Sequence, residues 1–286
     1  MFLNTELWLR ALLAIAIGFA VSFASTPIVK TFAQKVGAMD VPKDARRVHD
    51  HPIPRMGGLA IFLGFLLSVL LFLELNPQMR GMLLGAVIIV VLGIFDDIYS
   101  LRAMFKFVVQ IVAALVAVLS GNVIEAVSNP NVFSADLYWE LGWLKIPVTI
   151  IWIVAITNAV NLIDGLDGLA CGVSTISSMT LLVIALVASE PNVAILMAAL
   201  AGGCLGFLPY NMNPAKIFMG DTGSTFLGYI LAVVSIQGLF KFYTIISFAV
   251  PFLMLGLPIF DTCFAFIRRI AHGQSPMHAD RSHVHH

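Results

Sequence analysis

Long apolar runs separated by short polar segments follow one another along almost the whole chain. Nine runs approach or exceed the length that a helix needs to cross about 30 Å of hydrocarbon. They cover residues 7–29, 57–75, 82–95, 105–120, 146–157, 169–189, 193–209, 223–239 and 244–267. This pattern predicts an all-α protein, a polytopic membrane helix bundle with about nine spans.

Two of these runs, 82–95 and 146–157, are short for a bilayer. We expect them to be extended by flanking polar residues that line the protein interior instead of contacting lipid. The first run differs from a cleavable leader because its positive charges, Lys30 and Lys35, follow the apolar core. We therefore expect a retained anchor. Alternating residues within 123–127 and 137–144 predict a small hairpin.

Composition supports the membrane assignment. Hydrophobic residues make up 59% of the chain, charged residues 11%, and the mean hydropathy is +0.96. A soluble domain carries about 25% charged residues. The net charge of zero excludes a strongly basic nucleic-acid-binding protein. The three cysteines lie in apolar stretches without metal-ligand spacing, so we interpret them as small buried hydrophobic residues.

The basic residues divide unequally between the two sets of loops. Because cytoplasmic loops are enriched in lysine and arginine, the richer set is assigned to the cytoplasm and the N-terminus to the outside. The other set holds Arg80, Lys145 and Lys241, with Arg10 at the outer start of the first run. The cytoplasmic set comprises Lys30, Lys35, Lys43, Arg46, Arg47, Arg55, Arg102, Lys106, Lys216, Arg268, Arg269 and Arg281.

The acidic residues also divide, by type. The predicted inner side holds aspartates and no glutamate, whereas the outer side holds mostly glutamates. The shorter carboxylate favours positioned groups of the kind that a hard cation needs. The alternative is chance combined with the preference of aspartate for turns. The pattern favours an active site on the cytoplasmic face.

Two adjacent carboxylates, Asp96 and Asp97, stand at the inner end of the third run. They repel each other unless a cation is present, and Mg²⁺ bridged to a phosphate suits such a pair. The alternative is a solvated helix end, which the helix dipole disfavours for acids at a C-terminus.

The stretch 157–168 carries polar residues at every third position: Asn158, Asn161, Asp164 and Asp167. This spacing places them on one slowly rotating helix face, and Gly165 and Gly168 then allow a turn or a close ligand. An ordinary amphipathic helix would carry lysine or glutamate here. The pattern therefore predicts a functional polar face.

The segment 218–224 precedes the eighth run. Its glycines and hydroxyls predict a helix start whose N–H groups hold an anion. Asp221 is either an N-cap or a metal ligand, and the company of Asp96 and Asp97 favours the metal. Phe218 either packs in the core or stacks on a base.

Two further segments carry charge. The loop 40–58 contains Lys43, Arg46 and His49, which either set topology or bind phosphate groups. The tail carries Arg281, His283, His285 and His286. A metal site, a pH-sensitive patch and an engineered tag are alternatives for it, and imidazoles that hydrogen-bond a sugar or a diphosphate fit its composition better.

Taken together, these residues resemble the polyprenyl-phosphate N-acetylhexosamine-1-phosphate transferases, glycosyltransferase family 4. The resemblance is carried by Pro54-Arg55-Met56-Gly57-Gly58, Asp96-Asp97, 158–168, 218–224, Pro258-Ile259-Phe260-Asp261-Thr262 and the final His-x-His-His. It implies transfer of a sugar-1-phosphate from a UDP-sugar to undecaprenyl phosphate with release of UMP. The tail most resembles the Gram-positive branch that begins the wall teichoic acid linkage unit with N-acetylglucosamine.

The resemblance also implies roles for individual residues. Asp96, Asp97 and Asp221 would hold Mg²⁺ and the diphosphate, with Asp97 as a possible base. Asn161, Asp164 and Asp167 would contact the uridine and ribose or orient the lipid phosphate, and Phe218 would stack on uracil. Arg281 and the three tail histidines would contact the sugar and diphosphate. Ser100 stands where the muramoyl-peptide branch has a lysine, so the role of that lysine is not transferred.

We expect residues 1–286 to form one transferase domain in a bacterial plasma membrane, truncated after the His-x-His-His motif, where relatives continue into another short membrane segment. The expected cofactor is Mg²⁺, with Mn²⁺ as a substitute. The expected partners are a UDP-N-acetylhexosamine, undecaprenyl phosphate, membrane lipids and, as an open alternative, a second copy in a homodimer. The alternative donor is UDP-MurNAc-pentapeptide. A transporter or flippase is the alternative class, and it predicts acids deep within spans and repeated halves.

Overall fold

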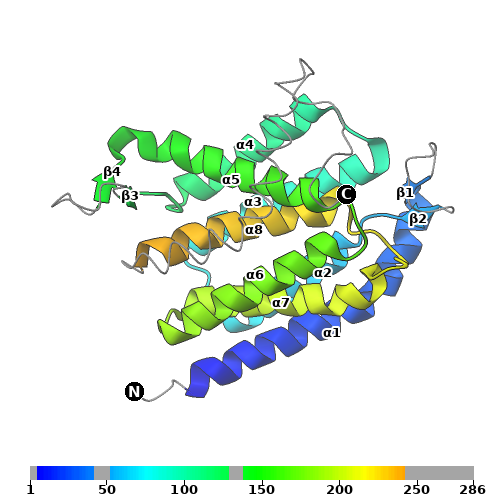
Figure 1. Ribbon diagram of the computed structural model, residues 1–286, viewed down its shortest axis with the longest axis horizontal. Coiled ribbons are helices and arrows are strands. Elements are labelled where there is room, and N and C mark those ends of the chain that lie inside the picture. The colour runs from blue at the N-terminus through cyan, green and yellow to red at the C-terminus, as the bar shows by residue number, and fades with distance from the viewer. Residues whose placement is uncertain (1–4, 42–51, 129–137, 242–286) are drawn as a thin grey trace.

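The computed structural model describes residues 5–41, 52–128 and 138–241. This part of the chain is mainly helical (Figure 1). Its helices are α1 (Thr5–Val36), α2 (Gly58–Phe72), α3 (Pro77–Tyr99), α4 (Ala103–Leu119), α5 (Lys145–Ile163), α6 (Leu169–Val187), α7 (Pro191–Asn211) and α8 (Gly220–Lys241), with a 3-10 turn, η1 (Gly142–Leu144). Two short hairpins, β1 (Met39–Asp40) with β2 (Ile53–Pro54) and β3 (Ala126–Ser128) with β4 (Tyr138–Glu140), complete it.

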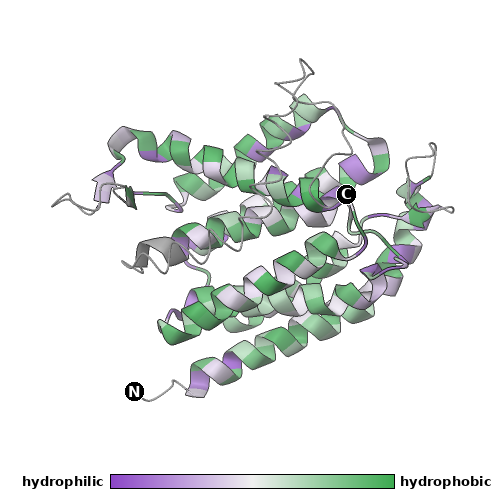
Figure 2. Ribbon diagram, viewed as in Figure 1, coloured by the Kyte–Doolittle hydropathy of each residue, from purple (hydrophilic) through white to green (hydrophobic). Residues whose placement is uncertain are grey.

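Eight of the nine predicted runs coincide with these helices, and the ninth, 244–267, lies outside the described residues. Within the described residues, five helical stretches are long and apolar enough to cross a membrane: α1, α3, η1 with α5, α6 and α7. The helices α2 and α4 are apolar but shorter. Apolar residues cover most of the helix surfaces, and hydrophilic residues gather toward the helix ends (Figure 2). The chain is a multi-pass helical membrane protein.

The helices form two groups that α2 and α8 join. In one group α7 packs against α1, α2 and α6, and in the other α8 packs against α3 and α5, with α4 beside α3 and α5 (Figure 1). The central helix α7 is buried almost continuously from Val193 to Phe207, and α8 is buried from Thr222 to Ile236. Both carry long apolar stretches without a polar face, which suits helices that are surrounded by other helices.

The two short runs become full-length helices, as expected. Asn76 begins α3 by accepting a hydrogen bond from the Met79 N–H at 2.8 Å, and the helix continues through Asp96 and Asp97 to Tyr99. Both aspartates are buried inside the protein. Helix α5 likewise runs beyond its apolar core to Ile163. Polar residues thus extend both helices while facing protein instead of lipid.

The hairpins lie at opposite ends of the bundle (Figure 1). The predicted hairpin is confirmed: β3 pairs antiparallel with β4, with Ala126 opposite Glu140. At the other end β1 pairs with β2, an element that was not predicted. Arg55, just after β2, donates to the Asp40 carboxylate at 2.9 Å and reinforces this hairpin. Among the described residues, the β1–β2 hairpin, which belongs to the predicted cytoplasmic side, and the β3–β4 hairpin, which belongs to the predicted outer side, thus lie at opposite ends.

Candidate active site

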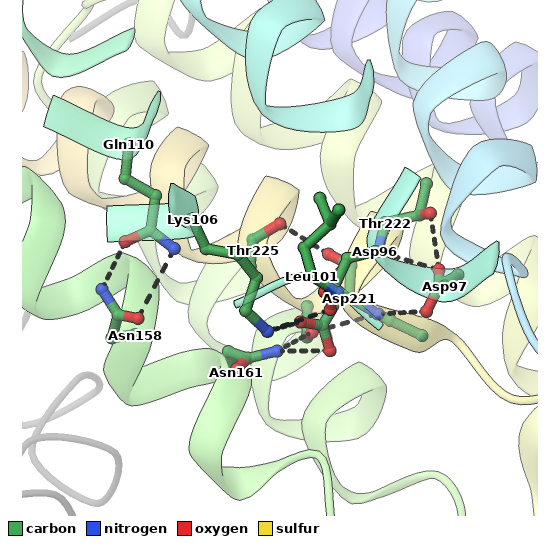
Figure 3. A network of polar contacts seen from close by, with 12 residues as sticks. Asp96, Asp97, Leu101, Lys106, Gln110, Asn158, Asn161, Asp221, Thr222 and Thr225 are labelled. Atoms are coloured by element: carbon green, nitrogen blue, oxygen red, sulfur yellow. Dashed lines mark hydrogen bonds and ion pairs between the residues drawn. The ribbon is translucent and has the colours of Figure 1, made fainter. Parts of the chain in front are cut away.

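A polar cluster occupies the same end of the bundle as β1–β2, where α3 and α5 end and α4 and α8 begin (Figure 3). At its centre the Lys106 ammonium lies 2.9 Å from Asp96 Oδ2 and 2.8 Å from Asp221 Oδ2. These three side chains come from α4, α3 and α8. Each is at least partly shielded from solvent, so the charges interact more strongly than at an open surface.

Further hydrogen bonds fix the two carboxylates. The Leu101 N–H donates to Asp96 Oδ1 at 2.7 Å, in the turn that links α3 to α4. The Asn161 amide donates to Asp221 Oδ1 at 3.2 Å and to Ser224 Oγ at 2.7 Å. Asp96 and Asp221 are therefore presented in fixed positions on either side of one cationic group.

Asp97 faces away from Lys106, toward the start of α8 (Figure 3). Its Oδ1 accepts the Asp221 N–H at 3.0 Å. Its Oδ2 accepts the Thr222 N–H at 3.1 Å and the Thr222 hydroxyl at 2.6 Å. With a residue exposure of 4%, Asp97 is buried. The two adjacent aspartates thus have different surroundings, although the sequence treats them as one pair.

The two asparagines of α5, Asn158 and Asn161, also have different partners. Asn158 pairs with Gln110 of α4, its amide donating to Gln110 Oε1 at 2.6 Å and to the Val154 carbonyl at 2.8 Å. Figure 3 shows this pair beyond Lys106, away from Asp97. Asn161, one turn later, reaches Asp221. Asn158 therefore joins α5 to α4, whereas Asn161 belongs to the charged centre.

The expected single helix face does not extend to Asp164 and Asp167, because α5 ends at Ile163. Asp164 follows as the C-cap residue. Asp167 Oδ2 accepts the Ala215 N–H at 3.0 Å and so fastens the loop between α7 and α8. Gly168, with φ of 73°, then adopts the left-handed conformation that glycine tolerates and allows α6 to begin.

Burial, together with the carboxylates of Asp221 and Asp97, raises the pKa of Asp164 to about 8, while Arg55 acts in the opposite direction. The Asp164 carboxyl therefore favours its protonated form over a wider pH range than a solvent-exposed carboxyl does.

The raised pKa predicts a pH-dependent stability. The unfolded Asp164 carboxyl ionises near 3.8 and the folded one near 8, so the free energy of unfolding falls as pH rises between these values. We expect Asp164→Asn to remove this loss and to have a higher Tm than the wild type at pH 8 with EDTA. Thermal unfolding in detergent from about pH 5 to about pH 8 measures it. The exposed Glu125→Gln variant serves as control, and a wild-type Tm that rises across this range would contradict the prediction.

Several predicted substrate-binding residues lie outside the described part of the chain. Phe218 lies within it, half-buried, two residues before α8. Its N–H donates to the Pro54 carbonyl at 2.8 Å, and its carbonyl accepts from Gly57 N–H at 2.9 Å. Base stacking by Phe218 stays a prediction. The residues outside are Lys43, Arg46, His49, Arg281, His283, His285 and His286.

The described residues include no group of three or more histidine, cysteine, aspartate or glutamate side chains arranged to hold one metal ion. Mg²⁺, however, is commonly held by one or two carboxylates together with substrate phosphates and water. Asp96 and Asp221 fit that requirement, because a single ammonium contacts an oxygen of each. The carboxylates of Asp96 and Asp221 outnumber the Lys106 ammonium that lies between them, so an anionic substrate needs additional positive charge here.

The sequence interpretation missed Gln110, and it treated Lys106 only as a marker of topology. Thr222 and Ser224 were expected as hydroxyls of the helix start at 218–224, but not their contacts with Asp97 and Asn161. One signal was present. Lys106 and Gln110 are four residues apart in an otherwise apolar helix, so they share one face. A cation in such a helix is a functional candidate by default.

Comparison with known proteins assigns the class. The model described as "Glycosyl transferase family 4" matches residues 79–239, which include most of α3, all of α4 to α7 and most of α8. The chain belongs to glycosyl transferase family 4, and the predicted membership is confirmed.

Individual relatives extend the similarity over nearly the full chain. A probable undecaprenyl-phosphate N-acetylglucosaminyl 1-phosphate transferase of Bacillus subtilis is 46% identical over 98% of this chain and 78% of its own length. An undecaprenyl-phosphate alpha-N-acetylglucosaminyl 1-phosphate transferase of Thermotoga maritima is 33% identical over 93% of this chain and 78% of its own length. A phospho-N-acetylmuramoyl-pentapeptide-transferase of Caldicellulosiruptor bescii is 36% identical over 76% of this chain and 71% of its own length.

Proposed function

We propose that this protein transfers N-acetylglucosamine-1-phosphate from UDP-N-acetylglucosamine to undecaprenyl phosphate, releasing UMP. The observation that carries the proposal is the Asp96–Lys106–Asp221 cluster, in which one ammonium lies between two carboxylates. This cluster belongs to a chain that is 46% identical to the Bacillus subtilis relative. Binding sites of transporters lie near the bilayer midplane, whereas this cluster lies at one end of the bundle. Membership of a transferase family also favours an enzyme.

The proposed reaction joins two anions, and each described side chain has a part in it. Lys106 offers an ammonium to phosphate oxygens and stabilises the charge that develops as the bond to UMP breaks. Asp96 and Asp221 would hold Mg²⁺, for which Mn²⁺ can substitute. When bound, this ion neutralises the diphosphate. Asn161 keeps Asp221 in place through its hydrogen bonds to Asp221 and Ser224.

In the proposed step an oxygen of undecaprenyl phosphate attacks the β-phosphorus of the UDP-sugar. A new P–O–P linkage forms, the bond between the β-phosphorus and the bridging oxygen breaks, and UMP leaves with the electron pair. A phosphate monoester has its second pKa near 6, so it is largely ionised at neutral pH and little base catalysis is required. The site residues need to position and neutralise the phosphates more than to move protons.

The cytoplasmic face is the proposed location of this site. The helix ends that carry the site lie at the same end of the bundle as the β1–β2 hairpin (Figure 1). Among the described residues, Lys35, Arg55, Arg102 and Lys216 belong to segments at that end, and such an excess of basic residues favours the cytoplasmic side. A soluble nucleotide sugar and a lipid phosphate meet at such a boundary. The proposed membrane is the bacterial plasma membrane, with the N-terminus outside.

A UMP-release assay tests the proposal. The purified chain in detergent is supplied with UDP-N-acetylglucosamine or UDP-MurNAc-pentapeptide, with and without undecaprenyl phosphate, and with Mg²⁺ or EDTA. We expect UMP only from UDP-N-acetylglucosamine, and only when both undecaprenyl phosphate and Mg²⁺ are present. Release from the muramoyl donor alone would overturn the donor assignment. No UMP from either donor would remove the activity.

A further inference from the structure

The two neighbouring aspartates at the end of α3 contact different partners. Asp96 faces Lys106, whereas the Asp97 carboxylate faces the first turn of α8 (Figure 3). We infer that Asp97 is a positioning residue, which anchors the start of α8 and thereby sets the position of Asp221. Only the kinetic part of the inference rests on the proposed function, because the anchoring itself is independent of turnover.

The hydrogen bonds at Asp97 match the needs of a helix start. The first N–H groups of a helix have no partner within it, and a carboxylate is favoured there because it also interacts with the helix dipole. Asp97 accepts the N–H groups of Asp221 and Thr222 and the Thr222 hydroxyl. A cap of this kind usually comes from the residue before the helix. Here a different helix, α3, supplies it across a long sequence separation.

The backbone around this contact leaves no space for side chains. A Cβ at Gly93, one turn before Asp97 in α3, would lie 2.6 Å from the Thr222 nitrogen. A Cβ at Gly220 would lie 2.7 Å from Asp97 Oδ1, and Gly220 has a φ of 73°. Contacts this short are essentially never made by real Cβ atoms. The first turn of α8 therefore rests directly on α3, and its distance from Asp97 is fixed by the packing.

A second contact holds the other side of the same turn. The Gly57 N–H donates to the Phe218 carbonyl and the Gly58 N–H to the Met219 carbonyl, both at 2.9 Å. The residues just before α8 are thus joined to the segment after β2. A Cβ at Gly58 would lie 2.8 Å from the Thr222 carbonyl carbon. The start of α8 is held from both sides, so Asp221 cannot shift without breaking one of these contacts.

This arrangement assigns Asp97 a different task from a metal ligand or a base. Three donors already occupy its two oxygens, and none of the three is Lys106. A metal ligand must present a carboxylate oxygen to the ion, and a base must present one to the substrate, whereas both Asp97 oxygens accept hydrogen bonds from the first turn of α8. The Asp97 carboxylate instead stabilises the backbone that carries Asp221, and acts on the reaction through it.

Asp97→Asn tests the assignment with three measurements on the full chain in detergent. The amide places N–H groups against N–H donors, so we expect hydrogen exchange at residues 221 and 222 to rise at least about tenfold. We expect kcat for UMP release to fall about a hundredfold, because the displaced Asp221 is misaligned. The Kd for Mn²⁺, measured by electron paramagnetic resonance, should change less than about threefold, because both proposed ligand carboxylates remain and a small shift of Asp221 disturbs the alignment of the reacting phosphates more than the binding of the ion. Asp221→Asn, the comparison variant, should lose Mn²⁺ binding.

Different failures are distinguishable. If Asp97→Asn loses Mn²⁺ binding as Asp221→Asn does, Asp97 is a ligand and the inference is wrong. Unchanged exchange at residues 221 and 222 would also overturn it. Absence of UMP release from the wild-type protein would instead count against the proposed function, and the exchange and Mn²⁺ measurements would still decide the role of Asp97.

Thr222 provides a second variant that leaves every carboxylate in place. Thr222→Val removes one donor to Asp97 while keeping the shape, and we expect kcat to fall about tenfold with Mn²⁺ affinity retained. Thr222→Ser keeps the hydroxyl and should restore kcat to near the wild-type value. Equal kcat values for Thr222→Val and the wild type would contradict the anchoring role.

Gly93→Ala supplies a third, purely steric variant. The added methyl group presses on Thr222, so we expect the same loss of kcat and rise in exchange as in Asp97→Asn. Gly172→Ala in α6 is the matched control, because a Cβ there meets nothing within 4 Å. If both glycine variants leave kcat unchanged, close packing of α8 on α3 is not required, and the inference fails.

Discussion

Asp221→Asn is expected to reduce sugar-phosphate transfer by at least about a thousandfold. The substitution keeps the size of the side chain but removes the carboxylate that meets Lys106 at 2.8 Å and Asn161 at 3.2 Å. Lys106 is then left with Asp96 alone, and the proposed Mg²⁺ site loses one of its two carboxylates. The defect should appear in kcat for UMP release and in Mn²⁺ binding together.

Glu125→Gln is the matched control, since it exchanges a carboxylate for an amide at the opposite end of the bundle. Glu125 is exposed and pairs with Lys145 at 3.2 Å, so we expect transfer to remain at the wild-type level. Retention of full transfer by Asp221→Asn would show that the cluster is not the reaction centre.

Lys106→Met is expected to reduce transfer by about a hundredfold to a thousandfold. Methionine keeps the unbranched chain and its packing but removes the ammonium that is proposed to neutralise phosphate charge. The same change should raise the affinity for Mn²⁺ without nucleotide, because a cation no longer shares the oxygens of Asp96 and Asp221 with an ammonium.

The opposite signs of these two effects make Lys106→Met informative. UMP release measures the loss and electron paramagnetic resonance the gain in Mn²⁺ binding. Lys145→Met, which removes an exposed ammonium at the other end of the bundle, should change neither. Weaker Mn²⁺ binding in Lys106→Met would mean that Lys106 supports the cation site instead of competing with the ion for it.

Much of the helical architecture could be predicted because a membrane helix requires a long apolar run, which is visible in the sequence. The short run 82–95 was correctly expected to continue into polar residues, and α3 does so through Asp96 and Asp97. The end of α5 was harder to predict. The three-residue spacing of polar residues continues past Ile163, so it predicted a helix that extends beyond the end of α5. Asp167 instead accepts a hydrogen bond from Ala215, a tertiary contact that the local sequence does not reveal.

Most of the residues of the site were predicted from the sequence, but their hydrogen-bond partners were not. An anion was expected at the start of the helix after 218–224, and an anion is present: it is the Asp97 carboxylate, from another helix. Lys106 was missed because it was counted only among the basic residues that set topology, although it shares one face of an apolar helix with Gln110. Its importance comes from contacts with Asp96 and Asp221, and the contact with Asp221 spans 115 positions of the chain.

The central claim is that this site transfers a sugar phosphate and not a sugar alone. UDP-N-acetylglucosamine labelled with ³²P at the β-phosphorus, incubated with undecaprenyl phosphate and Mg²⁺, tests it most directly. We expect the label to pass into the organic-extractable lipid while unlabelled UMP is released, and we expect Asp221→Asn to abolish both. Label that remains in water-soluble UDP, with unlabelled sugar in the lipid, would contradict it.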